Sequence, residues 1–261
     1  MNAIDTAAGR IGLLQARPQD PTGLPILFLH GVGSDKSVWR PQLDHFGQTR
    51  HALAADYPGY GDSAPVEATS RDDYARAMIA LLDAVAIDRA HICGLSLGGV
   101  VAIAMATLAP QRCASLIIAD SFAVHPDGQG IYDRSTSAAQ QIGMRALAEA
   151  RVDVLLGDKP PAGLRDEVIE TMAAIPVSTY AQGAEAVWLA DQRERAAAIA
   201  IPTLIPCGDE DQVTPPALSR ALSQLVKGSE VAIVKGAGHL ANAERPDAFN
   251  SLVERFVSAA D

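Results

Sequence analysis

Hydrophobic residues in the first half of the chain alternate between short continuous runs and longer stretches with helical spacing. The short runs predict buried strands over residues 26–29, 51–55, 91–93 and 116–119. The longer stretches, residues 72–85 and 100–108, predict helices between these strands. Strands that alternate with helices are typical of a parallel sheet with helices on both faces. Residues 10–16 predict an additional antiparallel edge strand.

From about residue 122 to residue 199 the strand pattern disappears. Helical periodicity covers residues 137–156, 164–174 and 179–197, and a Lys-Pro-Pro-Ala-Gly turn is expected at 159–163. Strand patterns return at 202–207 and 230–234, and helical patterns at 217–225 and 246–257. The sequence therefore predicts an α/β fold with a mostly parallel central sheet flanked by helices. Residues 1–121 and 200–261 would form its core, and residues 122–199 a helical insertion.

A glycine-rich motif, Gly94-Leu95-Ser96-Leu97-Gly98-Gly99, links a predicted strand to a predicted helix. At a strand-to-helix turn of this kind, a nucleophilic serine is exposed by strained backbone with positive φ. The positions two before and two after the serine must then lack side chains, and both are glycine here. The alternative is a turn that holds a phosphate at a helix N-terminus. Since the Lys of a P-loop and the G-x-G-x-x-G spacing are both missing, we favour Ser96 as a nucleophile.

Two later loops supply the groups that a serine needs for activation, namely a base and an acid that orients the base. Asp211 follows the predicted strand at 202–207, where sites in open α/β sheets are built. Asp209 and Glu210 are alternatives in the same loop. His239 follows the predicted strand at 230–234, and it is the only one of the six histidines C-terminal to Asp211. The sequence therefore predicts a catalytic triad of Ser96, Asp211 and His239.

The loop His30-Gly31-Val32-Gly33 directly follows the predicted strand at 26–29. Such a loop supplies one backbone N–H of an oxyanion hole. We assign this donor to Val32, with Gly33 as a near-equal alternative, and expect the His30 side chain only to hold the loop. The second donor is the N–H of Leu97, because the first residue of a helix has no acceptor within that helix.

Composition and charge narrow the class of protein. A chain of 261 residues with 48% hydrophobic residues can bury one sizeable core, so one domain with an insertion is expected. The formal net charge of −10 opposes a phosphate-binding surface and therefore a nucleic-acid partner. Cys93, Cys113 and Cys207 form no C-x-x-C pair and are expected to be buried free thiols in a reducing compartment.

Two further features of the sequence bear on the location of the protein. The N-terminal residues lack a basic start followed by an apolar core, so no secretory signal is expected and the cytoplasm is the expected location. The most apolar stretch, residues 97–109, is too short to cross a bilayer as a helix. We therefore expect no membrane association.

Together these motifs resemble those of the α/β-hydrolases over nearly the whole chain, and most closely those of 3-oxoadipate enol-lactonases and related small serine esterases. The matching segments are His30 to Ser34 with Trp39, Gly94 to Gly99, Gly208 to Pro216, and Gly236 to Glu244 with Pro246 and Phe249. One segment departs from the lactonases: Pro58-Gly59-Tyr60-Gly61-Asp62-Ser63 stands where many of them carry an Arg-Gly-His-Gly-like sequence. The resemblance implies that residues 122–199 form a helical cap over the active site.

The mechanism expected from these residues is hydrolysis of a small carboxylic ester or lactone through an acyl-enzyme on Ser96, with no metal or organic cofactor. An enol-lactone that carries a carboxylate would need a cation in the pocket. The insertion offers Arg134, Arg145, Arg151, Arg165, Arg193 and Arg195. We interpret Met144 and Trp188 as core residues rather than pocket residues.

Other functions are compatible with the same triad. One is hydrolysis of a C–C bond in a diketone from aromatic ring cleavage, and another is the peracid chemistry of cofactor-free haloperoxidases and perhydrolases. A third, from a different class, is a ligand receptor that retains the hydrolase fold and turns over slowly. A product assay separates the first two from ester hydrolysis, and a comparison of turnover with binding affinity separates the third.

Overall fold

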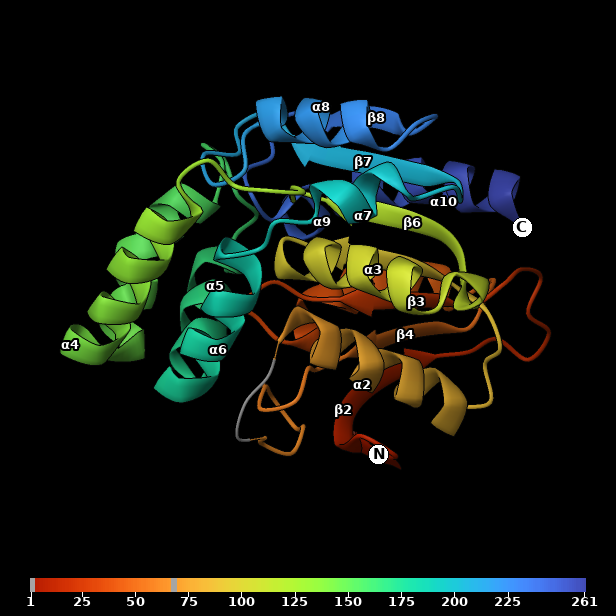
Figure 1. Ribbon diagram of the computed structural model, residues 1–261, viewed down its shortest axis with the longest axis horizontal. Helices are drawn as coiled ribbons and strands as arrows, with labels where there is room; N and C mark the ends of the chain where they lie inside the picture. The colour runs from red at the N-terminus through yellow and green to blue at the C-terminus, as the bar shows by residue number, and fades with distance from the viewer. Residues whose placement is uncertain (1–2, 67–69) are drawn as a thin grey trace.

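The computed structural model describes residues 3–66 and 70–261 and contains an eight-stranded sheet between layers of helices (Figure 1). The strand order is β1-β2-β4-β3-β5-β6-β7-β8. Every pair from β4 to β8 in this order is parallel, whereas β2 runs antiparallel to both of its neighbours, β1 and β4. The predicted α/β fold with a mostly parallel sheet is therefore confirmed. Residues 1, 2 and 67–69 of the expected core lie outside the described residues.

The predicted strands all form, with small shifts at their ends. Their bounds are β2 (Gly9–Ala16), β3 (Ile26–Leu29), β4 (Ala52–Ala55), β5 (Ala90–Leu95), β6 (Cys113–Ala119), β7 (Thr203–Gly208) and β8 (Glu230–Val234). The first strand, β1 (Ala3–Thr6), was not predicted; it is partly exposed and pairs only with β2 at the edge of the sheet. Its four residues, of which two are polar, carry little strand signal.

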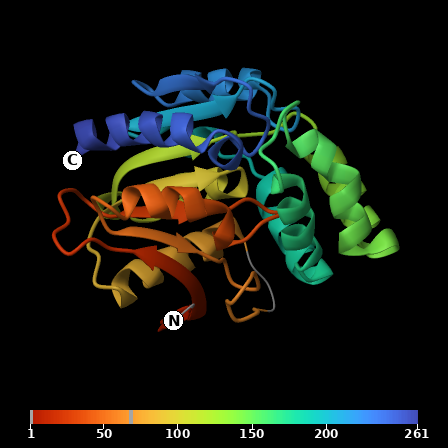
Figure 2. The same cartoon turned by 180° about the vertical axis from the view of Figure 1, so that it is seen from behind.

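Helices cover both faces of the sheet. The face in view in Figure 1 carries α2 (Arg71–Ala84), α3 (Leu97–Leu108), α7 (Arg193–Ala197) and α8 (Pro216–Leu225). The view from behind shows α1 (Arg40–Phe46) and α10 (Pro246–Ala260) over the opposite face (Figure 2). The remaining short helices are η1 (Lys36–Trp39), η2 (Pro110–Arg112) and α9 (Ala241–Glu244). These three and α1 are too short to show a helical period in the sequence, and none was predicted.

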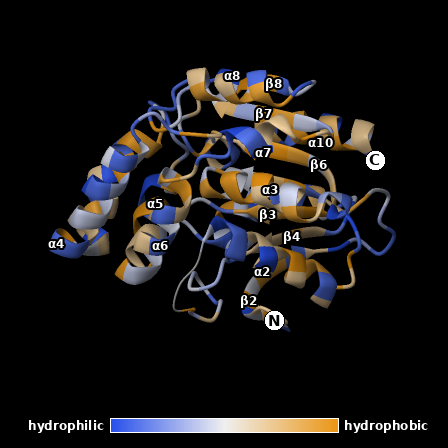
Figure 3. Ribbon diagram, viewed as in Figure 1, coloured by the Kyte–Doolittle hydropathy of each residue, from blue (hydrophilic) through white to orange (hydrophobic). Residues whose placement is uncertain are grey.

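Two apolar clusters, one on each face, hold the layers together. Side chains alternate across a strand, so in β3 Leu27 and Leu29 join one cluster while Ile26 and Phe28 join the other. All four are fully buried. Hydrophobic residues accordingly dominate α3 and the central strands, whereas α4 is hydrophilic along much of its length (Figure 3). The buried sheet therefore provides a rigid base for the loops at its edge.

The segment between β6 and β7 is helical, as predicted, but it is divided differently. It forms α4 (Gly128–Leu155), α5 (Leu164–Ala173), α6 (Val177–Trp188) and α7. The stretch expected to be one helix over 179–197 ends at Trp188, because Asp191 bridges to Val124 in an extended pairing and the Gln192 N–H donates to the Ala123 carbonyl (2.8 Å). Helix α4 begins earlier than expected and is broken at Gly143, whose φ is 80°.

Helices α4, α5 and α6 lie beyond one edge of the sheet, on the side to which the β7 arrow points (Figure 1). The carboxyl ends of parallel strands meet on that side, and loops that build sites in open α/β sheets leave from it. Among the described residues, no helix has the length and apolar composition needed to cross a membrane.

The turn after β5 gives a direct test of the packing. A Cβ atom on Gly94 would lie 2.1 Å from the Gly98 carbonyl oxygen, which belongs to backbone that cannot move aside. We expect Gly94→Ala to lower the free energy of unfolding by about 1–3 kcal/mol or more, measured by chemical denaturation.

Gly130→Ala is the control for this change. The atoms nearest to a Cβ at Gly130 belong to the side-chain ends of Asp127 and Arg134, which are exposed, and the residue lies within a helix. Its stability should stay equal to wild type or rise by about 0.5–1 kcal/mol. A Gly94→Ala protein as stable as the Gly130→Ala protein would contradict the close packing described for this turn.

Candidate active site

Ser96 lies at a sharp turn between β5 and α3. Its φ is 56° and its ψ is −111°, and its N–H donates to the Ala119 carbonyl (2.9 Å). A Cβ on Gly94 would collide with Gly98, and one on Gly98 would lie 2.1 Å from the Leu29 carbonyl oxygen. The predicted strand-to-helix turn with positive φ is thus confirmed, together with the requirement for small residues on both sides of Ser96.

The Ser96 turn has a further support that the sequence pattern did not reveal. The Ser121 hydroxyl donates a hydrogen bond to the Ser96 carbonyl (2.7 Å), and both residues are buried. Ser121 follows β6, so the neighbouring strand fixes the peptide that carries Ser96. A lone serine after a strand gives no signal in the sequence that would identify this contact.

Asp211 and His239 meet across two loops. The Asp211 Oδ2 atom lies 2.9 Å from His239 Nδ1 and accepts a hydrogen bond from the Thr214 hydroxyl (2.6 Å). Its other oxygen accepts from the N–H groups of Val213 (2.7 Å) and Thr214 (2.9 Å). Both partners are buried, at 3% exposure for Asp211 and 4% for His239. The carboxylate is therefore held by hydrogen bonds on both oxygens and points at one ring nitrogen.

The contact between Asp211 and His239 determines which ring nitrogen of a neutral His239 carries the proton. Burial alone would raise the pKa of Asp211, but the charge of His239 and the hydrogen bonds from His239 and Thr214 lower the pKa to about 2. Asp211 is therefore ionised at neutral pH and can only accept. The proton of a neutral His239 ring then resides on Nδ1, which leaves Nε2 free to accept a proton.

The His239 loop is anchored to the end of α4. The His239 N–H donates to the Leu155 carbonyl (2.8 Å). The buried carboxylate of Glu244 accepts from the N–H groups of Gly238 (2.9 Å) and Gly157 (2.8 Å) and so ties the same two segments together. Sequence reasoning missed Glu244, because a glutamate in a short helix is usually solvated.

The alternatives to Asp211 have other partners. The Asp209 carboxylate accepts a hydrogen bond from the Gly236 N–H (2.6 Å), and the Glu210 carboxylate accepts one from the Asp158 N–H (2.7 Å). Each of these carboxylates joins its loop to a neighbouring loop. Of the three acidic residues, the one in contact with His239 is Asp211.

The loop of residues 30–33 passes beside Ser96. A Cβ on Gly31 would lie 3.5 Å from the Ser96 Cβ. The His30 side chain is fully buried, and its Nδ1 lies 2.8 Å from the Gly31 carbonyl oxygen, so it holds the loop as expected. The Tyr60 hydroxyl donates to the Val32 carbonyl (3.3 Å). Leu97, the other candidate oxyanion donor, is the first residue of α3 and is buried.

A buried network of charged residues supports the loop of residues 30–33 through the neighbouring segment of residues 56–63. Asp56 is fully buried and accepts hydrogen bonds from the N–H groups of Lys36 (2.8 Å) and Asp62 (2.9 Å). The Lys36 ammonium donates to both Asp56 and Asp62. This network fixes the segment of residues 56–63, which departs from the lactonase pattern and carries Tyr60. The sequence pattern gave no sign that Lys36 would hold this segment through Asp56 and Asp62.

Ser96 and His239 line one cavity of about 740 Å³. The segment of residues 31–33 forms part of its wall, and Trp188 and Met172 contribute from the inserted helices. Trp188 also stacks on Phe122, so our interpretation of it as a core residue was incomplete: it belongs both to the core and to the cavity wall. The predicted nucleophile, base and first oxyanion donor therefore face the same space.

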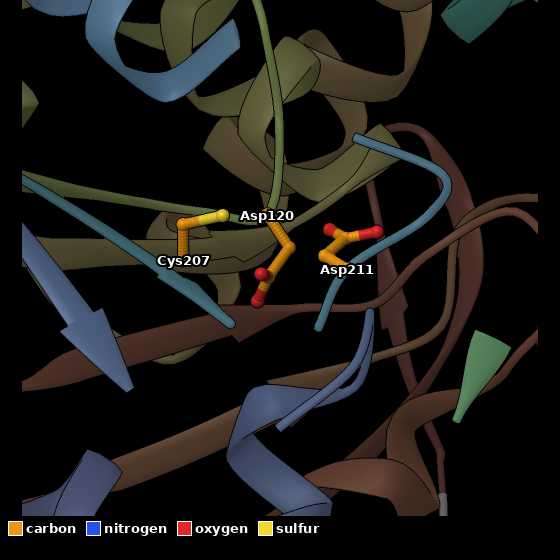
Figure 4. A group of neighbouring side chains, drawn as sticks. All are labelled: Asp120, Cys207 and Asp211. Carbon is orange, nitrogen blue, oxygen red and sulfur yellow. The ribbon is translucent and has the colours of Figure 1, made fainter. Parts of the chain in front are cut away.

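Asp120, Cys207 and Asp211 form a second polar cluster, with ligand atoms within 4.8 Å of one another (Figure 4). Their chemistry does not suit a metal ion. Burial raises the pKa of the Cys207 thiol, so the thiol form is favoured, and the sulfur donates to the carbonyls of Gly208 and Thr214. Both oxygens of Asp211 are already hydrogen-bonded.

Asp120 is the unusual member of the cluster. It is fully buried with a positive φ of 45°, and its Oδ1 accepts from the Gly208 N–H (2.8 Å), while its Oδ2 has no partner among the described residues. Burial, and then the charge of Asp211, raise its pKa well above the ordinary value. The raised pKa therefore favours the protonated form of this carboxyl next to the ionised Asp211.

Comparison with known proteins identifies the class. Residues 26–252 match the alpha/beta hydrolase family, and the chain belongs to that family. It is 28% identical to a 3-oxoadipate enol-lactonase of Acinetobacter baylyi over 250 residues, which cover 94% of this chain and 93% of the relative. It is also 28% identical to a 2-hydroxymuconate semialdehyde hydrolase of Pseudomonas sp. strain CF600, with 92% and 88% covered.

The fold agrees with this assignment. The enol-lactonase of Burkholderia xenovorans LB400 superimposes with a TM-score of 0.89 at 24% identity, covering 98% of this chain and 99% of the other. At that identity the likeness establishes the shared fold. The family and the named relatives together support a hydrolase.

The raised pKa of Asp120 makes the stability of the fold depend on pH in a defined direction. In the unfolded chain an aspartate loses its proton above about pH 4, whereas the raised pKa lets the folded protein hold it to higher pH, so the folded state binds more protons and stability falls as pH rises. An asparagine at this position would have no proton to lose. We expect the stability of Asp120→Asn relative to wild type to rise between pH 5 and pH 8, by at most about 1.4 kcal/mol per pH unit.

Urea unfolding of both proteins at several pH values measures this difference directly. Because every other titrating group is common to the two proteins, the change in the difference reports on Asp120. Parallel pH profiles would show that Asp120 is ionised in the folded protein.

Proposed function

We propose that the protein is a serine hydrolase that cleaves a small carboxylic ester or lactone through an acyl-enzyme on Ser96. The observation that carries this proposal is the 2.9 Å contact between Asp211 and His239 at the wall of the cavity that Ser96 also lines. A carboxylate, an imidazole and a strained serine in this relation supply an acid, a base and a nucleophile.

In the proposed reaction, His239 Nε2 takes the proton of the Ser96 hydroxyl while Ser96 Oγ attacks the substrate carbonyl carbon. The ionised Asp211 stabilises the imidazolium that forms and keeps the ring in the required orientation. The proton then passes to the leaving oxygen as the C–O bond breaks. A water molecule, activated by the same histidine, attacks the acyl-enzyme and releases the acid.

Two backbone N–H groups would stabilise the negative oxygen of the tetrahedral intermediate. They belong to Leu97, at the start of α3, and to Val32, with Gly33 as the alternative in the same loop. The contacts of His30, Tyr60 and Asp56 support this role, because they hold that loop rigid before the substrate binds. Rigid donors need no reorganisation when the charge develops.

We further propose that residues 122–199 act as a cap over the core formed by residues 1–121 and 200–261. Support comes from the position of α4, α5 and α6 beyond the sheet edge in Figure 1 and from the cavity-lining residues Met172 and Trp188. The cap would exclude water from the reacting groups and shape the space for the acyl chain.

The relative that is named a 2-hydroxymuconate semialdehyde hydrolase favours a second candidate, hydrolysis of a C–C bond in a ring-cleavage product. The same Ser96, Asp211 and His239 would take part in it. Assay of the purified protein with a dienoate diketone, alongside esters and lactones, distinguishes the two by the products formed.

Removal of the nucleophile tests the main proposal. We expect Ser96→Ala to lower kcat for p-nitrophenyl butyrate by at least about 10³-fold, because the acyl-enzyme can no longer form. The release of p-nitrophenolate measures the rate. The urea midpoint of the variant should match that of wild type, so that a loss of activity is not a loss of fold. Turnover within about tenfold of wild type by a folded Ser96→Ala protein would exclude Ser96 as the nucleophile.

A further inference from the structure

The arginines of the inserted helices differ in whether their charge is already neutralised. Five of the six form ion pairs: Arg134 with Asp127, Arg145 with Glu170, Arg165 with Asp153, Arg193 with Asp191, and Arg195 with Asp72. Arg151 is the exception. Within residues 3–66 and 70–261, its guanidinium makes no ion pair and no hydrogen bond.

Arg151 is also the one of the six that lines the cavity containing Ser96 and His239. It is half-buried on α4, one helical turn before Leu155. Residues four apart lie on the same helix face, about 6 Å along the axis. Leu155 lines the same cavity and accepts the His239 N–H (2.8 Å). Arg151 therefore lies close to the contact that fixes the proposed catalytic base.

A second cavity, of about 630 Å³, shares part of its lining with the first. Arg151 and Val213 line both cavities. Arg151 therefore borders open space in which a polar group of a ligand can lie. A half-buried cation without a partner attracts an anion more strongly than an exposed cation does, because the lower dielectric constant around it strengthens the attraction.

Other charged residues of the cavity wall are less suited to this role. Asp166, Glu167 and Glu170 are exposed residues of α5, and Glu170 is already paired with Arg145. Arg40, at the start of α1, is the other cavity-lining cation, and it is exposed to solvent. Exposed charges attract a ligand weakly because water and salt screen them.

We propose that Arg151 binds a carboxylate of the substrate, and that the preferred substrates are esters or lactones whose acyl part carries a negative charge. This inference rests on the proposed hydrolase function and deepens it. A guanidinium can hold a carboxylate through two parallel hydrogen bonds, which fix its position as well as its charge. Arg151 would thus position the acyl chain relative to Ser96.

The test compares two substrates with the same leaving group: p-nitrophenyl butyrate, which is neutral, and the mono-p-nitrophenyl ester of glutaric acid, which carries one carboxylate. Arg151→Gln should lower kcat/KM for the glutarate ester by about tenfold or more, the range expected for a lost charge-assisted hydrogen bond. Most of the change should be in KM. Turnover of the butyrate ester should stay within about twofold, which also shows that the variant is folded.

Three further proteins complete the experiment. Arg151→Lys keeps the positive charge and should retain a large part of the activity on the glutarate ester. Arg193→Gln makes the same change of charge within the inserted segment, at a residue whose ion-pair partner, Asp191, does not line the cavity, and it should leave both substrates unaffected. Arg40→Gln removes the other cavity cation, and a selective loss of glutarate activity in this variant instead of Arg151→Gln would overturn the proposal.

The remaining outcomes are equally clear. An equal fall of both activities in Arg151→Gln would indicate a structural role, and no change in either would show that Arg151 does not contact the acyl chain; each overturns the inference. If wild type cleaves the butyrate ester but Arg151→Gln shows no selective loss on the glutarate ester, the proposed hydrolase function still stands and only the role of Arg151 is overturned. A wild-type protein that cleaves neither ester removes the proposed function, and the assignment of Arg151 with it.

Discussion

The close approach of backbone around Ser96 is the constraint from which the site is built. With φ at 56°, the serine cannot continue β5 or begin α3, so its side chain stands at the point where the strand becomes a helix. The backbone of Gly98 lies too close to Gly94 for Gly94 to carry a Cβ atom. The backbone of Leu29 lies too close to Gly98 in the same way. Because these contacts involve main-chain atoms of the central sheet, the strain is held by the most buried part of the fold.

The other groups of the site reach Ser96 through connections between distant segments. Asp211 follows β7 and His239 follows β8, two adjacent parallel strands, so their loops leave the same edge of the sheet. The His239 loop is also joined to the inserted helices through Leu155 and Glu244. The orientation of the proposed base therefore depends on the insertion as well as on the sheet, and a change in α4 is expected to affect the catalytic geometry together with the cavity.

The sequence predicted those parts of the fold and site that have a local signal. Strand β3 was recognisable from a short apolar run, and the Ser96 turn from glycines that the backbone requires. The division of the last predicted cap helix at Asp191 depends on a pairing with a distant segment, which periodicity cannot reveal. The supporting roles of Glu244 and Asp120 have the same origin, because each is a buried carboxyl that accepts a hydrogen bond from a backbone group far away in the chain.

The most direct measurement of the proposed chemistry is covalent labelling with a fluorophosphonate, which reacts with a serine activated by a histidine base. Intact-mass analysis of the native protein should show one adduct, peptide mapping should place it on Ser96, and protein unfolded in urea should not react. An adduct on another residue, or none under conditions where p-nitrophenyl butyrate is turned over, would contradict an activated nucleophile at Ser96.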